Sequence, residues 1–559
     1  MSSRWLIIAL VAPLLCIVPV CVAVPASSFS ELNWAVSTAA SNITITAIDI
    51  AFDHELEVYG KDFSIEGSDR ATLSGKDYGR LFVLKSSALT LCRVKLAHGR
   101  CLGCSGGAIF ASNGSVLVLH LVHILANRAQ FGGAVYMWNS QFIANNCTMS
   151  SNSAESGGAV YARGDSVFSA TNCMMTANSA NLYGGAVSVL GNAIFTVTDS
   201  TLSSNAAGGG SDFLHISGNG GGGAVSASQS STFTATQCTM LSNSAGFGGA
   251  VNVEDGATLT ATRCTMTQNS AHMAGGVLNA LGNTTSTVTD STLSSNAAAR
   301  GGAVSASQSS TFAATLCTIS SNTAAITGGA VNAWDSSTVT ATDCTMSANS
   351  AVFRGGAVDI SGKFIATDCT IIANCAEWGG AVNAQDGSAF TATSCTISSN
   401  TAHYAGGAVN AYDSSTITAT NCTMSANSAV FRGGAVNVFG APPHAPDGPN
   451  FHTTVTATDC MLGLNHAQYG GAVAVHDHGS CFTATQCTIT SNSASHSGGG
   501  LEVGRIGGFI YIRSSFVAHN RAEVRMMNLS NGYSARACKR FDPICAYAFR
   551  WPAAQRCRK

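Results

Sequence analysis

The chain has 559 residues, of which 59 are glycine and only 10% are charged, and its formal net charge is −2. About a quarter of an ordinary globular chain is charged, so this composition excludes an ordinary mixed α/β enzyme, and the small net charge gives no electrostatic case for nucleic-acid binding. A hydrophobic content of 46% with only 9 prolines argues against both disorder and collagen.

Residues 1–26 are predicted to be a secretory signal. Arg4 precedes an apolar run from Trp5 to Val24, and cleavage is expected after Ala23 or Ala26. The alternative is an uncleaved signal anchor, because the run is nearly long enough to cross a bilayer. Since no later segment is comparably apolar, we expect a secreted or cell-surface protein with no transmembrane segment in its mature part. Sequons that would make it a glycoprotein begin at Asn42, Asn113, Asn146, Asn283, Asn421 and Asn528.

A Gly-Gly-Ala-Val unit, or a close variant of it, repeats fifteen times within residues 106–520, with a period near 26 residues. Two longer spacings contain insertions, at 208–220 and 440–452. The Gly pairs begin at Gly106, Gly132, Gly157, Gly184, Gly222, Gly248, Gly275, Gly301, Gly328, Gly355, Gly379, Gly406, Gly433, Gly470 and Gly498.

An asparagine and a cysteine keep fixed places in the unit. The asparagine follows the Gly pair by about 21 residues, as at Asn349, and in most units a cysteine stands five residues before it. Stacked units would bring equivalent cysteines within disulfide range, but their side chains would point in parallel, so we expect a ladder of buried thiols. These cysteines are Cys147, Cys173, Cys238, Cys264, Cys317, Cys344, Cys369, Cys395, Cys422, Cys460 and Cys487.

The apolar pattern inside each unit has the period of a strand. Phe233 and Ala235 alternate with Thr234 and Thr236, and Gly pairs and Ser-Asn clusters separate three short strands per unit. Neither the leucine-rich pattern nor helical spacing is present. One turn of a parallel β-helix fits, with turns about 4.8 Å apart and stacked asparagines forming an amide ladder. The predicted fold is therefore an all-β, right-handed parallel β-helix of about fifteen or more coils.

The repeats resemble those of bacterial polymorphic outer membrane proteins, which pair Gly-Gly-Ala-[Ile/Leu/Val] with Phe-x-x-Asn. In this chain the second motif has Met, Ile or Leu in place of Phe, as at Met149–Asn152, Met346–Asn349 and Ile489–Asn492. The resemblance implies a repeat β-helix over residues 106–520 and says little about function.

Residues 27–105 resemble the beginning of many right-handed parallel β-helices. The resemblance implies a short amphipathic capping helix over Phe29–Ala40 and first coils that include Phe63–Gly67 and Ala71–Gly75.

The last segment, 521–559, is basic and contains Cys538, Cys545 and Cys557. It is interpreted either as a patch for an anionic polysaccharide or membrane surface, or as a poorly ordered end or disulfide-closed cap over the last coil.

Several residues have side chains that could bind a metal ion. Asp386 and Asp413 follow the Gly pairs of consecutive units and could hold Ca²⁺ together, but their contexts are those of ordinary Asx turns. His476 and His478 would share a strand face, with His466 and His496 in adjoining units. Because this set is irregular and unrepeated, we predict no metal site and no cofactor.

Two short motifs remain. Arg163-Gly164-Asp165 spells an integrin-recognition tripeptide, which a glycine-rich chain also produces by chance. Cys101 and Cys104 form a Cys-x-x-Cys motif without a partner pair at zinc spacing.

Catalytic residues are not apparent in the sequence. The Asn-Thr-Asp, Asp-Asp and Gly-His-Gly motifs of β-helix enzymes acting on pectin are missing, and charged residues are scattered singly. We therefore expect no catalytic residues and a protein that is not an enzyme.

The leading hypothesis is adhesion to a polysaccharide or cell-surface ligand through a Ser/Thr-rich side wall, with the oligomeric state left open. The alternatives are a degenerate pectate-lyase-like carbohydrate-active enzyme and a Thr-array ice-binding protein. Alternation with buried residues should turn paired threonines outward in stacked files. The pairs are Thr196/Thr198, Thr234/Thr236, Thr260/Thr262, Thr287/Thr289, Thr340/Thr342, Thr391/Thr393, Thr418/Thr420, Thr456/Thr458 and Thr483/Thr485.

Overall fold

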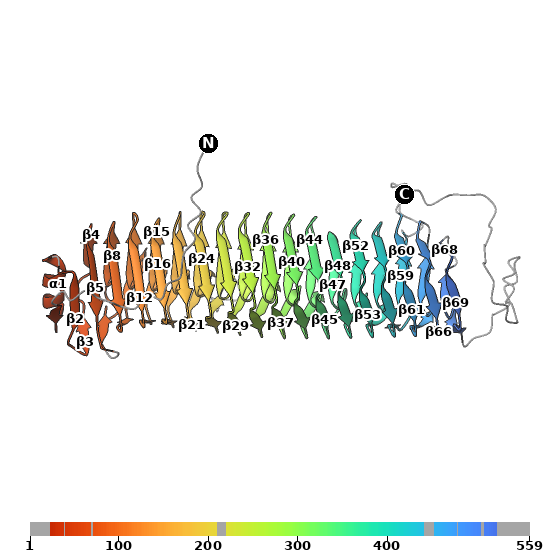
Figure 1. The fold of residues 1–559 in the computed structure, drawn as a ribbon, viewed down its shortest axis with the longest axis horizontal. Helices are drawn as coiled ribbons and strands as arrows, with labels where there is room; N and C mark the ends of the chain where they lie inside the picture. The colour runs from red at the N-terminus through yellow and green to blue at the C-terminus, as the bar shows by residue number, and fades with distance from the viewer. Residues whose placement is uncertain are drawn as a thin grey trace, which may run out of the picture.

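The computed structural model describes residues 23–522 except 39, 69–70, 209–219, 441–451, 478 and 505–507. Most of the predicted signal, nearly all of the basic segment 521–559 and most of both insertions therefore lie outside the described residues. The described part forms one straight stack of short parallel strands with a helix at its first end (Figure 1). This confirms the predicted all-β parallel β-helix, which has about 17 turns.

Four parallel sheets, called A to D, make the walls of the stack. A typical turn begins after Gly275 and contributes one strand to each sheet. Its strands are β35 (Leu278–Leu281) in sheet C, β36 (Thr285–Thr289) in sheet A, β37 (Thr292–Ser294) in sheet B and β38 (Ala297–Arg300) in sheet D. Each strand pairs in register with the equivalent strands of the turns before and after it.

The four sheets do not begin in the same turn. Sheet D begins later than the others, because the first turns contribute no strand to it. Sheet A runs from β1 (Val24–Ala26) and β2 (Asn42–Ile45) to β68 (Phe509–Arg513), and sheet B from β3 (Asp49–Ala51) to β69 (Phe516–Ala518). Sheet C runs from β4 (Leu56–Tyr59) to β67 (Leu501–Val503), and sheet D from β10 (Arg100–Ser105) to β70 (Arg521–Ala522).

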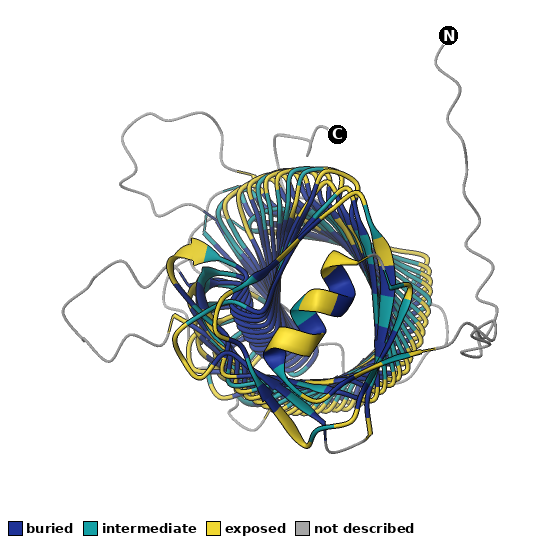
Figure 2. Cartoon of the chain, turned by 90° about the vertical axis from the view of Figure 1, so that its left-hand side faces the viewer, coloured by how far each residue is buried: buried dark blue, intermediate teal, exposed yellow. Residues whose placement is uncertain are grey.

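The one helix of the described residues, α1 (Phe29–Ser37), lies across the open end of the first turn (Figure 2). Its buried residues Phe29 and Leu32 join the core, so the predicted capping helix is confirmed. The helix is shorter than the predicted Phe29–Ala40, because the N–H and hydroxyl of Thr38 both donate to Trp34 O and end it. Strand β1 precedes the helix and is part of sheet A, so cleavage after Ala23 would keep it whereas cleavage after Ala26 would remove it.

The Gly pair makes the tight corner between sheets D and C. Gly328 has a φ of +65°, which favours glycine, and a Cβ on Gly329 would lie 2.1 Å from the carbonyl oxygen of Gly356 in the next turn. The corner therefore excludes side chains at both positions.

Stacking of identical residues fills the interior. Phe142, Phe168, Phe195 and Phe233 stack face to face with centroids 4.5, 4.7 and 5.1 Å apart. The repeated cysteines are buried without disulfides, as predicted. Their sulfurs lie against backbone carbonyls, as between Cys369 Sγ and Thr367 O, and several also accept from a backbone N–H, as Cys344 Sγ does from Cys317 N.

The asparagine ladder is confirmed, and it runs from Asn127 to Asn520. In each turn the amide Nδ2 donates to the Oδ1 of the next asparagine, and so does the backbone N–H. Asn349 shows the full set, because it donates to Asn374 Oδ1 from N and Nδ2 at 2.9 and 3.0 Å and to Ile319 O at 2.9 Å. Its own Oδ1 accepts two bonds from Asn322. The ladder thus satisfies buried groups in three successive turns.

Outward threonines are stacked in sheet A, as predicted. One file is continuous from Thr171 to Thr485, and the neighbouring file is interrupted at Ala313 and Ile365.

Replacing a ladder asparagine should destabilise the stack. We expect Asn349→Ala to lower the free energy of unfolding by about 1–3 kcal/mol, because buried donors and acceptors in adjoining turns lose their partners. The measurement is the denaturant midpoint, with exposed Asn283→Ala as the control. Asn283 has a φ of +56°, so its replacement costs only the asparagine preference for that conformation. Equal losses in the two variants would contradict a stabilising role for the ladder.

Candidate functional site

The outer face of sheet C, together with the adjoining edge of sheet D, carries most of the unusual side chains of the stack. Three positions of each turn face it: the residue before the Gly pair, and the fourth and sixth residues after the first glycine. In one turn these positions hold Thr327, Asn332 and Trp334, and the Thr327 hydroxyl donates to Asn332 Oδ1 at 3.0 Å. Residues distant in sequence therefore meet on this face.

A second amide file occupies the fourth position, and it ends on a carboxylate. Asn437 Nδ2 donates to Asn410 Oδ1 and Asn410 Nδ2 to Asn383 Oδ1, both at 2.8 Å. Asn383 Nδ2 then donates to Asp359 Oδ1 at 2.7 Å. The strands are β47 (Val358–Ile360), β51 (Val382–Ala384), β55 (Val409–Ala411) and β59 (Val436–Phe439).

Asp359 is the acid in this file of amides. The residue is 4% exposed, and burial raises its pKa to about 6, against the opposing effects of the Asn383 amide and the Arg354 guanidinium. A carboxyl group with a pKa in this range exchanges protons near neutral pH.

Arg354 and the neighbouring polar groups complete what we call the Arg354 cluster, which consists of Arg354, Asp359, Gln385, Tyr412 and Asp413. Arg354 Nη1 donates to Gln385 Oε1 at 2.7 Å, and the Tyr412 hydroxyl donates to the same oxygen. The guanidinium lies 5.7 Å from the centroid of the Tyr412 ring. Burial raises the pKa of Tyr412, and burial and then the Asp386 carboxylate raise the pKa of Asp413.

A strip of aromatic side chains follows the sheet D edge beside this cluster. Trp378 and Tyr404 have ring centroids 4.2 Å apart, and the contacts continue through Phe431 and Tyr469 to His496 at 5.2–5.3 Å. Tyr404 is 37% exposed. These residues belong to or follow β50 (Cys375–Trp378), β54 (Thr401–Ala405), β58 (Ser428–Ala429), β62 (His466–Tyr469) and β66 (Ser493–Ser497). Adjoining aromatic side chains at a surface mark a site for ligand contact.

A pocket of about 300 Å³ joins the strip to the cluster, and it is lined by Ile326, Thr327, Phe353, Arg354 and Trp378. Phe353 and Trp378 supply apolar contact in this pocket, and Arg354 supplies a charged group that can fix the orientation of a ligand.

A second polar group lies farther along the same face, around Arg432. In the fourth-position file Ala474 stands between Asn437 and Glu502, so a methyl group takes the place of an amide. Four atoms near this gap, Arg432 Nε, Asn437 Oδ1, His476 Nε2 and Glu502 Oε2, are buried and make no hydrogen bond within the described part of the protein. Burial and then Arg432 lower the pKa of His476 to about 4, and burial raises that of Glu502. Buried polar groups are almost always bonded, so these four atoms mark a departure from the regular packing of the stack.

The described residues considered as metal ligands do not form a metal-binding cluster, although the Asp386 and Asp413 carboxylates interact with each other. Asp386 and Asp413 occupy left-handed turns with φ of 53° and 49°, as expected for Asx turns. His466 Nδ1 is 2.9 Å from Ser493 Oγ, and His478 lies outside the described residues. Within the described ranges no three His, Cys, Asp or Glu side chains form a metal-binding group.

The Arg163-Gly164-Asp165 motif lies at an exposed turn after β19 (Val160–Arg163). The Asp165 N–H donates to Asn139 Oδ1 at 3.0 Å, so the turn is stabilised within the stack. None of the described helices is long and apolar enough to span a membrane.

The pH dependence of stability should report on Asp359. Its folded-state pKa exceeds the ordinary 3.8, so the proton stabilises the fold below pH 3.8, and this stabilisation is lost as pH rises toward 6. Asp359→Asn extends the amide file. We expect it to raise the free energy of unfolding at pH 7 by on the order of 2–3 kcal/mol, and to lose less stability than the parent protein between pH 4 and 6.

The control for this change is Asp290→Asn, at an exposed turn between β36 and β37, which should alter the pH profile little. Denaturant unfolding at several pH values measures both variants. Unchanged pH dependence in Asp359→Asn would show that this carboxyl does not titrate in that window.

Comparison with known proteins identifies the fold. The family described as "Right handed beta helix region" matches residues 275–444. The solved structures that are similar include a periplasmic alginate epimerase, AlgG, at 8% identity and a TM-score of 0.28, with 82% of this chain and 77% of that chain covered. No curated protein matches the sequence. The coarse prediction of a right-handed parallel β-helix is confirmed, and the epimerase activity is a property of that other protein.

The prediction that the chain is not an enzyme is contradicted, since an enzyme is among the solved structures to which the chain is similar. That prediction assumed that charged residues are scattered singly. Stacking instead brings Arg354 and Asp359, which flank one Gly pair, close to Asp386 and Asp413 of the next two turns. The sequence does contain a signal for this face, since an aromatic residue stands one or two positions before the Gly pair at Phe353, Trp378, Tyr404, Phe431 and Tyr469.

Proposed function

We propose that the protein is a secreted or cell-surface carbohydrate-binding β-helix that holds an extended polysaccharide along the outer face of sheets C and D. The observation that carries the proposal is the aromatic strip beside the Arg354 cluster, joined by one pocket. Stacked turns repeat the contact surface along the axis, which suits a ligand that is itself a chain of repeating units.

The two kinds of side chain have separate roles in this proposal. Trp378 and Tyr404 offer flat apolar faces to sugar rings, while Arg354 offers charged hydrogen-bond donors to hydroxyl or carboxylate oxygens. Asp359 and Tyr412 are groups that can give or take a proton beside the bound chain. The same site is therefore the place to look for carbohydrate-modifying activity.

The resemblance of the repeats to those of polymorphic outer membrane proteins supports the cell-surface location, and the apolar leader supports secretion. Adhesion to a polysaccharide-coated surface would follow from binding along this face.

The proposal predicts a specific loss of binding. We expect Trp378→Ala with Tyr404→Ala to weaken polysaccharide binding about tenfold or more, since a well-packed aromatic contact contributes on the order of 1–2 kcal/mol. Affinity electrophoresis in gels with neutral or uronic-acid polysaccharides measures the binding, and the composition and chain length of the polysaccharide after incubation measure turnover.

The matched control changes the opposite kind of surface. Thr391, Thr393, Thr418 and Thr420 replaced together by Lys alter the sheet A wall while its inward residues stay in place. Binding that is lost in this variant but kept in the aromatic variant would assign the polysaccharide to the threonine wall and refute our choice of site.

The threonine wall supports a second candidate function, ice binding. The observation in its favour is the continuous file from Thr171 to Thr485, whose members pair in register at the spacing of parallel strands. If the wall binds ice, the full chain will produce thermal hysteresis that the four-lysine variant lacks. A full chain that leaves the freezing point equal to the melting point would exclude this candidate.

A further inference from the structure

The Cys-x-x-Cys motif lies at the beginning of sheet D, away from the aromatic strip. Cys101 and Cys104 are joined by a disulfide within β10, the first strand of that sheet. The register with β14 (Arg128–Phe131) shifts between Cys101 and Ser105, so the residues between them form a bulge. Bulges of this kind direct side chains away from the sheet.

The bulge makes one sulfur accessible and protects the other. Leu102 is 69% exposed, and Cys104 is exposed as well, whereas Cys101 is 6% exposed. An attacking group from solvent therefore reaches Cys104 first, and Cys101 is the sulfur that would leave.

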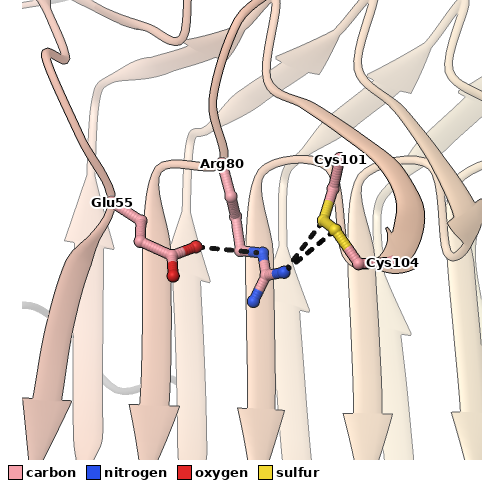
Figure 3. The surroundings of a disulfide bond; sticks show 4 residues. All are labelled: Glu55, Arg80, Cys101 and Cys104. Carbon is pink, nitrogen blue, oxygen red and sulfur yellow. Dashed lines mark hydrogen bonds and ion pairs between the residues drawn. A yellow bond between two sulfur atoms is a disulfide. The ribbon is translucent and has the colours of Figure 1, made fainter.

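A guanidinium group contacts both sulfurs (Figure 3). Arg80 Nη2 lies 2.9 Å from Cys101 Sγ and 3.5 Å from Cys104 Sγ, and its Nε lies 3.6 Å from Glu55 Oε2. The Arg80 side chain is 11% exposed and also lies 5.3 Å from the centroid of the Phe110 ring. A neutral disulfide gains little from a nearby cation, but a thiolate formed at Cys101 would be stabilised by it.

A pocket adjoins the exposed side of the bulge. It has a volume of about 320 Å³, and its lining includes Leu102, Gly103, Arg128, Gln130 and Glu155. The pocket gives a thiol-bearing molecule a place to bind against Leu102 and Gly103, the two residues between the cysteines.

The remaining described cysteines are neither disulfide-bonded nor exposed. The ladder thiols are buried and not disulfide-bonded, and Cys375 is half-buried, with its sulfur 3.6 Å from His403 Nε2. Buried structural cysteines of this type are inert.

We propose that Cys101–Cys104 is a redox-active disulfide that exchanges with external thiols. A thiolate attacks Cys104 Sγ, a sulfur–sulfur bond forms between them, and the Cys101–Cys104 bond breaks with the electron pair going to Cys101 as a thiolate beside Arg80. A second thiolate attacks the external sulfur of this mixed disulfide and releases Cys104, which takes a proton from water. Two external thiols are oxidised to one disulfide, and the protein gains two electrons.

The test uses the full chain and glutathione as the thiol. After incubation with reduced glutathione, alkylation and peptide mapping by mass spectrometry should find Cys101 and Cys104 labelled while the ladder cysteines stay unlabelled. Incubated with oxidised glutathione instead, Cys101→Ser should hold glutathione on Cys104 as a stable mixed disulfide, with release of one reduced glutathione, because the resolving thiol is gone. A pair that stays oxidised together with a Cys101→Ser variant that takes up no glutathione would overturn the proposal.

The role of Arg80 is tested on the reduced protein. We expect Arg80→Gln to slow alkylation of Cys101 at neutral pH about tenfold and to move its pH profile upward, because the thiolate loses its nearby cation. Arg80→Lys should keep most of the rate. Arg128→Gln is the matched control, since Arg128 lines the pocket while the guanidinium that contacts the two sulfurs is that of Arg80. Equal rates in Arg80→Gln and Arg128→Gln would contradict stabilisation of the thiolate by Arg80.

Discussion

The structure depends on the asparagine ladder, because it fixes the register of each turn on the next. Asn349 bonds to Asn374 ahead of it and to Asn322 behind it, and its amide also donates to Ile319 O. A shift of one residue in any turn would leave these buried groups without partners. The ladder thus selects one register, and the rest of the stack, including the close approach of Gly329 to Gly356, follows from it.

A fixed register converts a sequence period into surfaces. Each position of the repeat becomes a file along the axis, so threonines make a wall on sheet A and aromatic residues make a strip on sheet D. Within such a file a single departure is local: Asp359 replaces an amide, and Ala474 leaves a gap between Asn437 and Glu502. The departures, rather than the repeated residues, carry the candidate chemistry.

The repeated features could be predicted from sequence, and the departures could not. Periodicity predicts the stack, the asparagine ladder, the buried cysteines and the outward threonines because every turn repeats the same evidence. The Arg354 cluster arises once, from Arg354, Gln385 and Tyr412, which are 27 to 31 residues apart in the pairs that bond. Arg354 stands before its Gly pair, and the sixth-position residues Gln385 and Tyr412 differ in type from turn to turn, so no periodic signal brings them together. Arg80 lies in an early turn that has no sheet D strand, so the repeat pattern does not predict its contact with Cys101 either.

The side chains on the outer face of sheet C vary from turn to turn at positions that the geometry of the corner defines. The residue before the Gly pair and the fourth residue after its first glycine lie side by side across the corner, as the bond between Thr327 and Asn332 shows. The same two positions hold Arg354 with Asp359, and Arg432 with Asn437. The corner can therefore exchange neutral side chains for charged ones, turn by turn, without changing the backbone. Because the glycines exclude side chains from the corner itself, these flanking positions are where the fold can vary its chemistry.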